Sequence, residues 1–560
     1  MARRITAWLV GIVCMMVAVT AGAQERFGGL TGTVIDSTKA AVPGATVTAT
    51  NKATGATREV VTGADGTYRV PDLDPGRYSV TIELQGFQKV QLDDVIVLLG
   101  KMVGVDAELK TGQFTEVITV TADKTKQLDL ASVTLQHNVT AEEIDRIPKG
   151  RSFQSIATAA PGVNAGEIEG GFQVNGASGA ENVFTIDGVA TNSLIYGSSR
   201  QNTVFEYLQE VQVKTGGVDA EYGGALGGVI SAVTKSGGNR FTGETHYYYS
   251  GSGISAGPVK RLVLNPNDLR TVNYFQDEKQ ANNQNEFGGS LGGPIVRNHL
   301  FFFGSISPRV VRRTNEYAFS AGTEPGTIDQ DQTAWQGFGK ITYANSRVHA
   351  NGSVLMTPTR STGRLPAYDS IGTNFLTSTS AANTANRTRG FEADQNNVGG
   401  NVDLTLGAHG YLSMRGGYFY DNYKDTGVPL TTSYTYQQPS FNVPGVPPNL
   451  QGPVNTVNTP RIQITNFDTT KQGFVQFDYN HSFNAAGGHL LKGGWGVRRS
   501  VNDVDVSYPG GYVYLYWGQA FRSTATGQTG TGTYGYYRVD DLGTRGEVNA
   551  NIQNVYVQDT

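Results

Sequence analysis

The stretch GNVDLTLGAHGYLSMRGGYFYDNY, from Gly400 to Tyr423, consists of two alternating segments joined by a short glycine-bounded turn. One face carries Val402, Leu404, Leu406, Leu412, Met414, Gly416, Tyr418 and Tyr420, and the other carries Asp403, Thr405, Ser413 and Arg415. Period-two alternation over about nine to eleven residues is typical of a tilted strand that crosses a bilayer, with apolar side chains toward lipid and polar ones toward a lumen. The stretch predicts a transmembrane β-hairpin, although a soluble β-sandwich would show the same alternation.

The composition of the whole chain agrees with strands around a polar lumen. Of the 560 residues, 72 are glycine, nearly twice the usual share of about 7%, and only 16% are charged, against a usual share of about 25%. The segment FVQFDYNH repeats the alternation, with one face formed by Val475, Phe477 and Tyr479 and the other by Gln476, Asp478 and Asn480. A formal net charge of -4 without a long basic run excludes nucleic acid as an expected partner.

The N-terminal stretch MARRITAWLVGIVCMMVAVTAGAQE has the three parts of a secretory signal peptide. Arg3 and Arg4 form the charged part, residues 5–18 are apolar, and the small residues Ala21 and Ala23 predict cleavage after Ala23. The alternative is an uncleaved anchor, for which the apolar run is barely long enough. Cleavage would remove the only cysteine of the sequence. Because no later apolar stretch reaches about 18 residues, a membrane location requires a closed barrel.

Short strands separated by tight turns follow from about Gly29 to Lys110. Apolar residues alternate with threonine and serine in ATVTATN and RYSVTIEL, and Asp-Gly and Pro-Gly pairs separate the strands, which predicts a small β-sandwich. The segments TGTVIDSTKAAVPGATVTATN and DGTYRVPDLDPGRYSVTIELQGF resemble the carboxypeptidase regulatory-like domain, a prealbumin-type sandwich with a carbohydrate-binding-like fold. We interpret Asp72 and Asp74 as turn residues, with calcium ligands as the alternative.

A second zone, from about Gly112 to Gly238, contains EVITVTAD, IPKGRSFQSIATAAPGVN, NVFTIDGVATNS and YLQEVQVKTGGVDAEYGGALGGVISAVTKSGGNRFTG in that order. This ordered set resembles the plug domain of TonB-dependent outer-membrane receptors, in the Oar-like branch with an N-terminal regulatory-like domain. The plug signature that the resemblance implies consists of Asp187, Gly188, Glu221, Tyr222, Gly223, Gly227, Gly228, Thr234, Lys235, Ser236 and Gly237. Glycine suits a plug, since it allows the backbone to approach a barrel wall closely.

One segment of this zone suggests how the receptor would be energised. The residues Glu116, Val117, Ile118, Thr119, Val120 and Thr121 form a short extended run with an acidic head. The run resembles the coupling segment by which such receptors engage TonB, and an extended segment can add as a strand to a partner's sheet edge. The alternative interpretation is a closing strand of the preceding sandwich.

The predicted organisation is therefore all-β dominated, in four parts. These parts are a signal peptide (1–23), the regulatory-like β-sandwich (24–111), an α+β plug (112–239) and part of an antiparallel transmembrane β-barrel (240–560). Long polar stretches such as 437–460 would be extracellular loops, in which Tyr434, Tyr436 and Phe441 are either ligand-stacking or solvated residues.

The resemblance implies an outer-membrane receptor of the Gram-negative type that imports a substrate with TonB, ExbB and ExbD as partners. We expect an extracellular substrate, with an oligosaccharide as the first guess. The alternative is a non-transporting outer-membrane protein that binds glycans or mediates adhesion. We expect no enzyme and no cofactor or metal site, since the Gly288–Gly292 nucleophile-elbow pattern precedes Gly293-Pro294 where a helix is required.

The barrel segment is too short for the 22-stranded barrel that the resemblance implies. From Arg240 to Thr560 there are about 320 residues, whereas 22 strands of about ten residues with turns and loops need well over 400. The sequence also ends at VYVQDT, within an alternating segment. We therefore expect the sequence to be an incomplete part of a longer protein.

Overall fold

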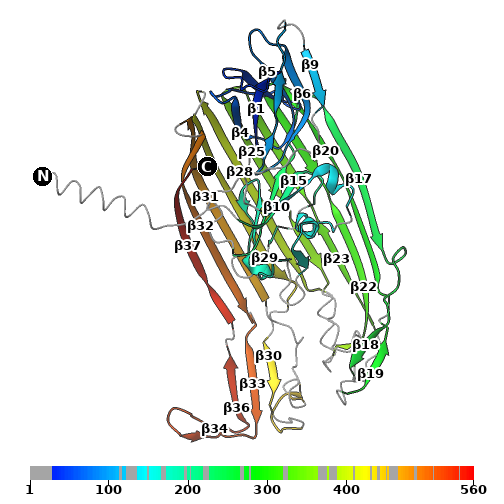
Figure 1. Cartoon of the computed structure of the whole chain (residues 1–560). Coiled ribbons are helices and arrows are strands. Elements are labelled where there is room, and N and C mark those ends of the chain that lie inside the picture. Colours follow the sequence, from blue (N-terminus) through cyan, green and yellow to red (C-terminus); the bar gives the residue numbers. More distant parts are fainter. Residues whose placement is uncertain are drawn as a thin grey trace, which may run out of the picture.

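The computed structural model describes residues 28–112, 117–121, 135–147, 150–165, 172–193, 199–201, 204–217, 226–264, 270–276, 279–319, 326–363, 375–376, 388–407, 410–428, 432–437, 442–448, 451–452, 465–484, 488–508, 510–540 and 543–559. A small β-sandwich, a compact inner domain and a large curved sheet make up this part of the chain (Figure 1). Within it, no helix has the length and apolar character to cross a membrane.

The β-sandwich contains two sheets. The first has the order β4-β1-β7, with β8 also on β1, from β1 (Gly28–Asp36), β4 (Thr67–Leu73), β7 (Met102–Gly104) and β8 (Ala107–Leu109). The second has the order β3-β2-β5-β6-β9, from β2 (Thr46–Asn51), β3 (Thr57–Val61), β5 (Gly76–Glu83), β6 (Lys89–Val97) and β9 (Val117–Thr121). The predicted alternation is confirmed, because β2 buries Val47 and Ala49 while β5 buries Tyr78, Val80 and Ile82.

The inner domain is built on a mixed sheet with the order β10-β15-β16-β13-β14. Its strands are β10 (Leu135–Thr140), β13 (Val183–Ile186), β14 (Val189–Ala190), β15 (Leu208–Gly216) and β16 (Val229–Thr234), with a hairpin of β11 (Val163–Ala165) and β12 (Phe172–Val174) beside them. Short helical segments α2 (Ala141–Ile144), η2 (Phe153–Ala159) and η3 (Gly179–Glu181) complete it. The short strand predicted at 229–234 is confirmed, and all six of its residues are buried.

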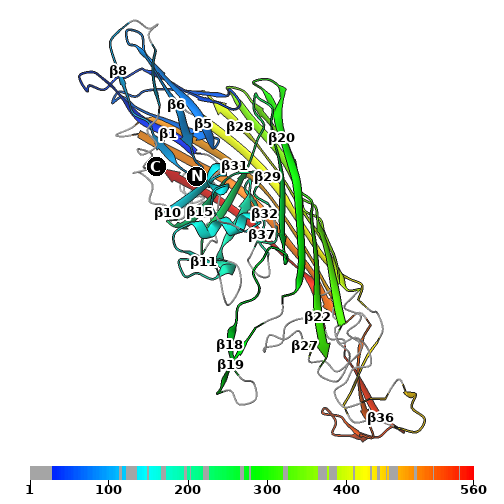
Figure 2. The same ribbon diagram turned by 90° about the vertical axis from the view of Figure 1, so that its right-hand side faces the viewer.

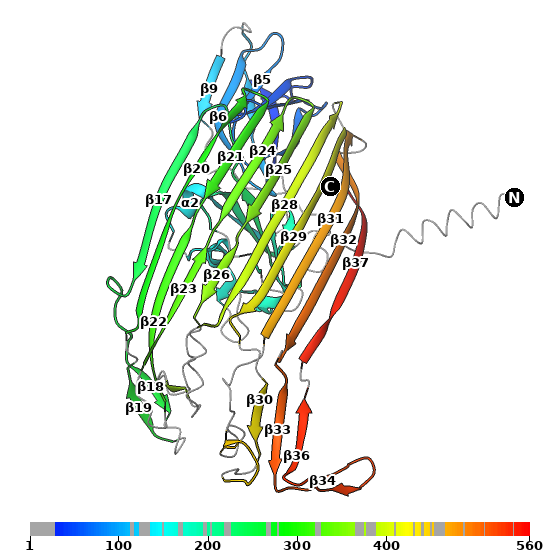
Figure 3. The same ribbon diagram turned by 180° about the vertical axis from the view of Figure 1, so that it is seen from behind.

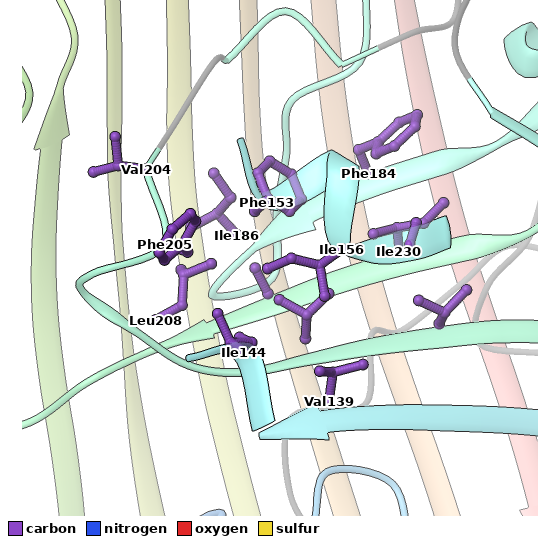
Figure 4. Close-up of a cluster of buried hydrophobic side chains, with 14 of the residues drawn as sticks. Val139, Ile144, Phe153, Ile156, Phe184, Ile186, Val204, Phe205, Leu208 and Ile230 are labelled. Atoms are coloured by element: carbon purple, nitrogen blue, oxygen red, sulfur yellow. The ribbon is translucent and has the colours of Figure 1, made fainter. Parts of the chain in front are cut away.

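The core of the inner domain continues into the wall of the large sheet. Ile144, Phe153, Ile156 and the apolar residues of β15 and β16 form one cluster (Figure 4), which also includes Phe303, Phe338 and Leu355 of the large sheet. Tyr207 stacks on Phe338 with ring centroids 4.9 Å apart. Apolar contact therefore fixes the inner domain against one side of the curved sheet.

The large sheet has fourteen strands and is antiparallel along its main path. Its strands are β17 (Thr242–Gly251), β20 (Ala281–Val296), β21 (Leu300–Ile306), β22 (Arg309–Phe319), β23 (Gly326–Ala334), β24 (Gly337–Ala344), β25 (Val348–Met356), β26 (Thr359–Thr362), β27 (Phe375–Leu376), β28 (Gly390–Leu406), β29 (Gly410–Thr426), β31 (Thr465–Asn484), β32 (Gly488–Ser507) and β37 (Gly543–Asp559). The sheet curves around the inner domain, which lies in its hollow (Figure 2), and its strands lie side by side when seen from behind (Figure 3).

Several neighbouring strands of this sheet are halves of one long crossing. β21 leads into β22, β23 into β24 and β25 into β26, each across two residues that leave the ladder. Pro308 and Pro358 lie in two of these breaks, and proline has no N–H to donate to a neighbouring strand. The breaks lie next to one another, since Ser307 and Gln336 exchange backbone hydrogen bonds and the Trp335 N–H donates to the Pro358 carbonyl.

The two faces of the large sheet differ as the alternation predicts. On β31, Val475, Phe477 and Tyr479 are 37–44% exposed, whereas Gln476, Asp478 and Asn480 are at most 6% exposed. The hairpin predicted at 400–423 is confirmed as β28 and β29, with Asp403 fully buried and Met414 exposed. The sheet therefore has a lipid-type outer face and a polar inner face.

The strands are longer than predicted. β28, β29, β31 and β32 have 17 to 20 residues instead of about nine to eleven, because they continue past the apolar band. On the outer face of β31 and β32, exposed Lys471 and Arg499 follow the apolar residues and mark the end of that band. Beyond it lies a small sheet of β30 (Ser433–Tyr436), β33 (Tyr512–Trp517) and β36 (Gly535–Asp540).

Further hairpins lie in the longer connections, β18 (Arg261–Leu264) with β19 (Val272–Phe275) and β34 (Phe521–Arg522) with β35 (Thr529–Gly530). Tyr436 belongs to β30 and is 1% exposed, so it is neither solvated nor open to a ligand. Phe441 lies outside the described residues. Short turns such as 297–299 and 345–347 lie at the end of the large sheet that contacts the sandwich, and the small sheets lie at the opposite end (Figure 1). Barrels place short turns in the periplasm and long connections outside.

Candidate functional site: the plug seated in the barrel lumen

The turn between β13 and β14 brings two predicted signature residues to the lumen wall. Asp187 and Gly188 both have positive φ, 46° and 81°, as the two central residues of a tight hairpin turn require. The Asp187 carboxylate accepts hydrogen bonds from the Thr234 N–H, at 3.0 Å, and from the Thr234 hydroxyl, at 2.5 Å. The turn is therefore hydrogen-bonded to the end of β16, through Thr234, a third signature residue.

A lysine from the large sheet completes this cluster. The Lys340 ammonium group on β24 donates to the Thr234 hydroxyl at 2.9 Å and lies 3.4 Å from the Asp187 carboxylate. The three side chains are nearly inaccessible to solvent. The two charges of such a buried pair depend on each other, because removing one would leave the other without an opposite charge in a poorly solvated place.

Three further signature residues carry the chain from the inner domain to the wall. The Lys235 ammonium group donates to the Glu206 carbonyl at 2.7 Å, and the Ser236 hydroxyl accepts from Thr342 of β24 at 3.4 Å. A Cβ on Gly237 would overlap the Phe302 carbonyl oxygen. This segment runs backbone to backbone along the wall, as the glycine-rich sequence predicts.

Gly227 and Gly228 lie before β16, where added Cβ atoms would meet Asn182 and Val174. Glu221, Tyr222 and Gly223 lie outside the described residues, as do Glu116, Ala21 and Ala23. Val117, Ile118, Thr119, Val120 and Thr121 form β9, which pairs in parallel with β6 of the sandwich. The roles assigned to all these residues stay predictions.

A second ionic cluster joins the inner domain to another part of the wall. The Arg200 guanidinium group lies 2.8 Å from the Asp421 carboxylate on β29 and 2.7 Å from the Asp468 carboxylate on β31. Gln395 on β28 donates to both the Arg200 carbonyl, at 2.5 Å, and Asp421, at 3.1 Å. One arginine thus contacts three neighbouring strands of the wall.

A third cluster centres on Arg151. Its guanidinium group pairs with the Glu206 carboxylate of the inner domain at 2.7 Å and with the Glu286 carboxylate of β20. It also lies over the rings of Phe205 and Tyr248, with 4.5 and 4.1 Å to the centroids. Both carboxylates are buried, so the arginine supplies the charge that they need.

The Arg151 cluster also contains the groups that a divalent metal would bind. Ligand atoms of Glu206, His246 and Glu286 all lie within 4.8 Å of one another. Arg151 already pairs with both carboxylates, and a metal ion would have to displace it against charge repulsion. The cluster therefore acts as an ionic contact between inner domain and wall.

The sandwich is attached to the inner domain by its β6–β7 turn. The Leu99 N–H donates to the Glu210 carboxylate at 3.1 and 3.2 Å, while Asn138 and Gln212 both donate to the Leu99 carbonyl at 2.7 Å. Burial raises the pKa of the Glu210 carboxyl to about 7, against the lowering effect of hydrogen bonds from Asn138 and Leu99. Glu210 lies on β15, outside the membrane-spanning strands.

The sandwich is also attached to the short-turn end of the large sheet. Asp74 accepts from His349 Nε2 at 2.8 Å, while His349 Nδ1 lies 3.4 Å from Asp403. At a second point, Asn239 donates to the Thr54 carbonyl at 2.8 Å and exchanges hydrogen bonds with Asn298. Asp74 is thus more than a turn residue, because it links the sandwich to β25.

Sequence reasoning did not find the residues that join these parts. Lys340, Arg200, Arg151, Glu210 and His349 have partners on different elements, between 111 and 275 positions away. The available signal was the inward position of charged residues on alternating strands, as for Lys340 and Asp468. That signal predicts a polar lumen without identifying the partners.

A sandwich, a polar-bound inner domain and a curved sheet with a lipid-type outer face define a plugged outer-membrane β-barrel. Comparison with protein families agrees, with matches to the Carboxypeptidase regulatory-like domain at residues 29–110, the TonB-dependent Receptor Plug Domain at 127–229 and an Outer membrane beta barrel domain at 233–440. Over these matched regions the chain is similar to the TonB-dependent receptors, and it is a protein of the Gram-negative outer membrane.

A relative and a solved structure give the extent of the likeness. The TonB-dependent transporter Oar of Myxococcus xanthus is 32% identical over 334 residues, which cover 56% of this chain and 30% of the relative. The match thus spans less than a third of that relative's length. The outer membrane transporter YddB from Escherichia coli is 15% identical, with a TM-score of 0.51 over 76% of this chain and 54% of that chain, and shows the shared fold.

Proposed function

We propose that this protein is an outer-membrane receptor that binds a substrate on the extracellular side and imports it when the plug is displaced. The observation that carries the proposal is the way the plug is held. Three buried ionic clusters, centred on Lys340, Arg200 and Arg151, join it to separate parts of the wall. These polar contacts act beside the apolar contact of the plug with Phe303, Phe338 and Leu355, and they can form again after a displacement.

Energy is needed to displace such a plug. Separating a buried ion pair before water reaches it leaves both charges poorly solvated, and an uncompensated buried charge costs about 3–5 kcal/mol. Thermal motion would therefore open the lumen rarely, and an external pull is required. We propose TonB, acting with ExbB and ExbD, as the partner that supplies it, and the segment from Glu116 to Thr121 as the point of attachment.

The pairing of β9 bears on both interpretations of this segment. β9 extends the sandwich sheet through parallel pairing with β6, as a closing strand would. Among the described strands β9 is the outermost of that sheet, so its other edge is available for strand addition. β9 can therefore be the closing strand of the sandwich and still serve as the segment that binds TonB.

Capture by the C-terminal domain of TonB tests the attachment. We expect deletion of residues 116–122, and Thr119→Pro within β9, to abolish capture of the detergent-purified protein, because proline removes a backbone N–H donor. Thr529→Pro in the extracellular strand β35 is the matched control and should leave capture intact. Undiminished capture by both altered segments would refute the coupling role and favour a non-transporting glycan-binding or adhesion protein.

A further inference from the structure

The extracellular sheet of β30, β33 and β36 displays a row of tyrosines on one face. Tyr512, Tyr514 and Tyr516 alternate along β33, and Tyr536 of β36 lies directly opposite Tyr516. We call these four residues the tyrosine ladder. Alternate residues of a strand share one face, so the ladder extends for about 13 Å between Tyr512 and Tyr516.

The rings of the ladder contact one another. The centroids of Tyr512 and Tyr514 are 4.9 Å apart, and Tyr516 stacks on Tyr536 at 4.3 Å with an angle of 7° between the rings. The Arg538 guanidinium group lies over the Tyr514 ring, 4.3 Å from its centroid. These contacts hold the side chains in fixed positions before any ligand arrives.

The position of the ladder excludes a role as a membrane girdle. On β32 the exposed Arg499 already lies beyond the apolar outer residues, and Tyr512 follows it by 13 further positions along the chain. The sheet that carries the ladder projects from the end of the barrel opposite the sandwich (Figure 1). The aromatic side chains therefore face water rather than lipid headgroups.

A structural core does not explain the ladder either. All six residues of β33 are only half-buried, so neither face of this strand is enclosed in a core. Half-exposed aromatic rows of this kind mark binding surfaces, because tyrosine combines a flat apolar ring with a hydroxyl group.

The charges on this face point to an uncharged ligand. Arg538 pairs with Asp540 at 2.8 Å, so the two charged side chains that β33 and β36 place on the ladder face compensate each other. An anionic ligand such as a phosphate or an acidic metal chelate would need an excess of positive charge. An open strip, rather than an enclosed pocket, suits an extended ligand.

We propose that the tyrosine ladder binds a neutral oligosaccharide. The apolar face of each sugar ring would lie on a tyrosine ring, and the hydroxyl groups at its rim would bond to tyrosine hydroxyls and to the Arg538–Asp540 pair. This proposal rests on the receptor function for its biological role. The binding itself requires neither TonB nor transport, so it can be tested when transport fails.

Calorimetric titration of the full-length protein in detergent tests the proposal. The probes are maltohexaose, cellohexaose, xylohexaose and chitohexaose, with hexagalacturonic acid as an anionic counterpart. We expect one or more neutral hexasaccharides to bind and the anionic one not to bind. The Tyr514→Ala and Tyr516→Ala variants should each weaken binding by roughly tenfold, since one aromatic contact contributes about 1 kcal/mol.

Two further variants separate stacking from folding. Tyr514→Phe keeps the ring and should retain most of the affinity, while Tyr537→Ala removes an aromatic side chain that is 68% exposed on the opposite face and should change nothing. The proposal fails if none of the neutral probes binds, or if Tyr514→Ala and Tyr537→Ala bind equally well. Binding of a protein partner that depends on the ladder, without sugar binding, would also overturn it.

Discussion

At the scale of single residues, buried ion pairs hold the plug against the wall of the large sheet. Lys340 is the cation for Asp187, and its side chain is 2% exposed. Arg200 serves Asp421 and Asp468, and Arg151 serves Glu206 and Glu286. Lys340 and Asp187 lie on different bodies, as do Arg200 and its two carboxylates and Arg151 and Glu286, so a single substitution changes how the plug is held against the wall.

The Lys340 contact gives the first prediction. Lys340→Met leaves Asp187 buried without its cation and should favour plug opening by on the order of 3 kcal/mol. The mature chain is predicted to have no cysteine, so Ala232→Cys, at a position 1% exposed, can report opening through maleimide labelling. We expect labelling to accelerate by about a hundredfold.

Two variants control that measurement. Lys52→Met removes a lysine whose pair with Asp94 is at the surface, and it should leave labelling unchanged. Adding Asp187→Asn to Lys340→Met removes both charges and should restore slow labelling. Equal labelling rates in wild type and Lys340→Met would contradict the role of this pair.

Glu210 gives the second prediction, a pH dependence of sandwich docking. Its pKa is about 7 in the docked state and would return toward 4.5 when the Leu99 turn leaves and water enters. The docked state then binds more protons between these values, so docking is strongest below about pH 4.5 and weakens as the pH rises to about 7, by about 3 kcal/mol in total.

Hydrogen exchange at the Leu99 amide, corrected for its intrinsic pH dependence, measures this effect. We expect less protection at about pH 8 than at about pH 5, and Glu210→Gln should flatten the difference. Glu108→Gln, at the surface of the sandwich, should leave the difference as in wild type. Protection that is independent of pH in the unmodified protein would show that Glu210 does not control docking.

At the scale of elements, alternation predicts strands well and their ends poorly. The hairpin of β28 and β29 and the inner and outer faces of β31 follow directly from the sequence, since period two and the bilayer determine which side chains face outward. The length of these strands does not follow, because the pattern loses its apolar face at Lys471 and Arg499 while the hydrogen-bonded ladder continues. Tyr436 was likewise predicted to lie in a loop, whereas it lies in β30, beyond the apolar band.

Gly237, in the segment that connects the plug to the barrel, gives a prediction at this scale. Its segment lies against the wall so closely that an added Cβ would overlap the Phe302 carbonyl oxygen and lie 2.9 Å from that of Gly293. Neither backbone oxygen can move without breaking the β20–β21 pairing. Gly237→Ala should therefore reduce the amount of folded protein in the outer membrane, measured by heat-modifiable migration on gels. Gly352→Ala, in β25 with open space around its Cα, should accumulate normally.

At the scale of the whole molecule, the sandwich joins plug and barrel. Its Leu99 turn contacts the plug, its Thr54 turn contacts Asn239 at the plug–barrel junction, and Asp74 contacts His349 on the barrel. None of these contacts could be predicted from the sequence. Each involves a turn, and the local sequence of a turn does not indicate which distant surface it contacts. The regulatory-like sandwich therefore contacts both the plug and the barrel, at the short-turn end of the large sheet.

This arrangement predicts a fixed position for the sandwich that depends on its barrel contacts. Spin labels at Ser37→Cys in the sandwich and Ser346→Cys in a barrel turn, both exposed, should give one narrow distance distribution in pulsed electron resonance. Combining Arg58→Ala, Asn239→Ala and His349→Ala removes the side-chain contacts of the sandwich with Thr405 and Tyr411, the side-chain hydrogen bonds of Asn239 and the His349–Asp74 contact, and leaves the Leu99 contact with the plug. The distribution should then broaden, since fewer contacts hold the sandwich against the barrel, whereas Thr38→Ala at the sandwich surface should leave it narrow. A broad distribution in the otherwise unmodified protein would mean that the sandwich does not hold the plug against the barrel.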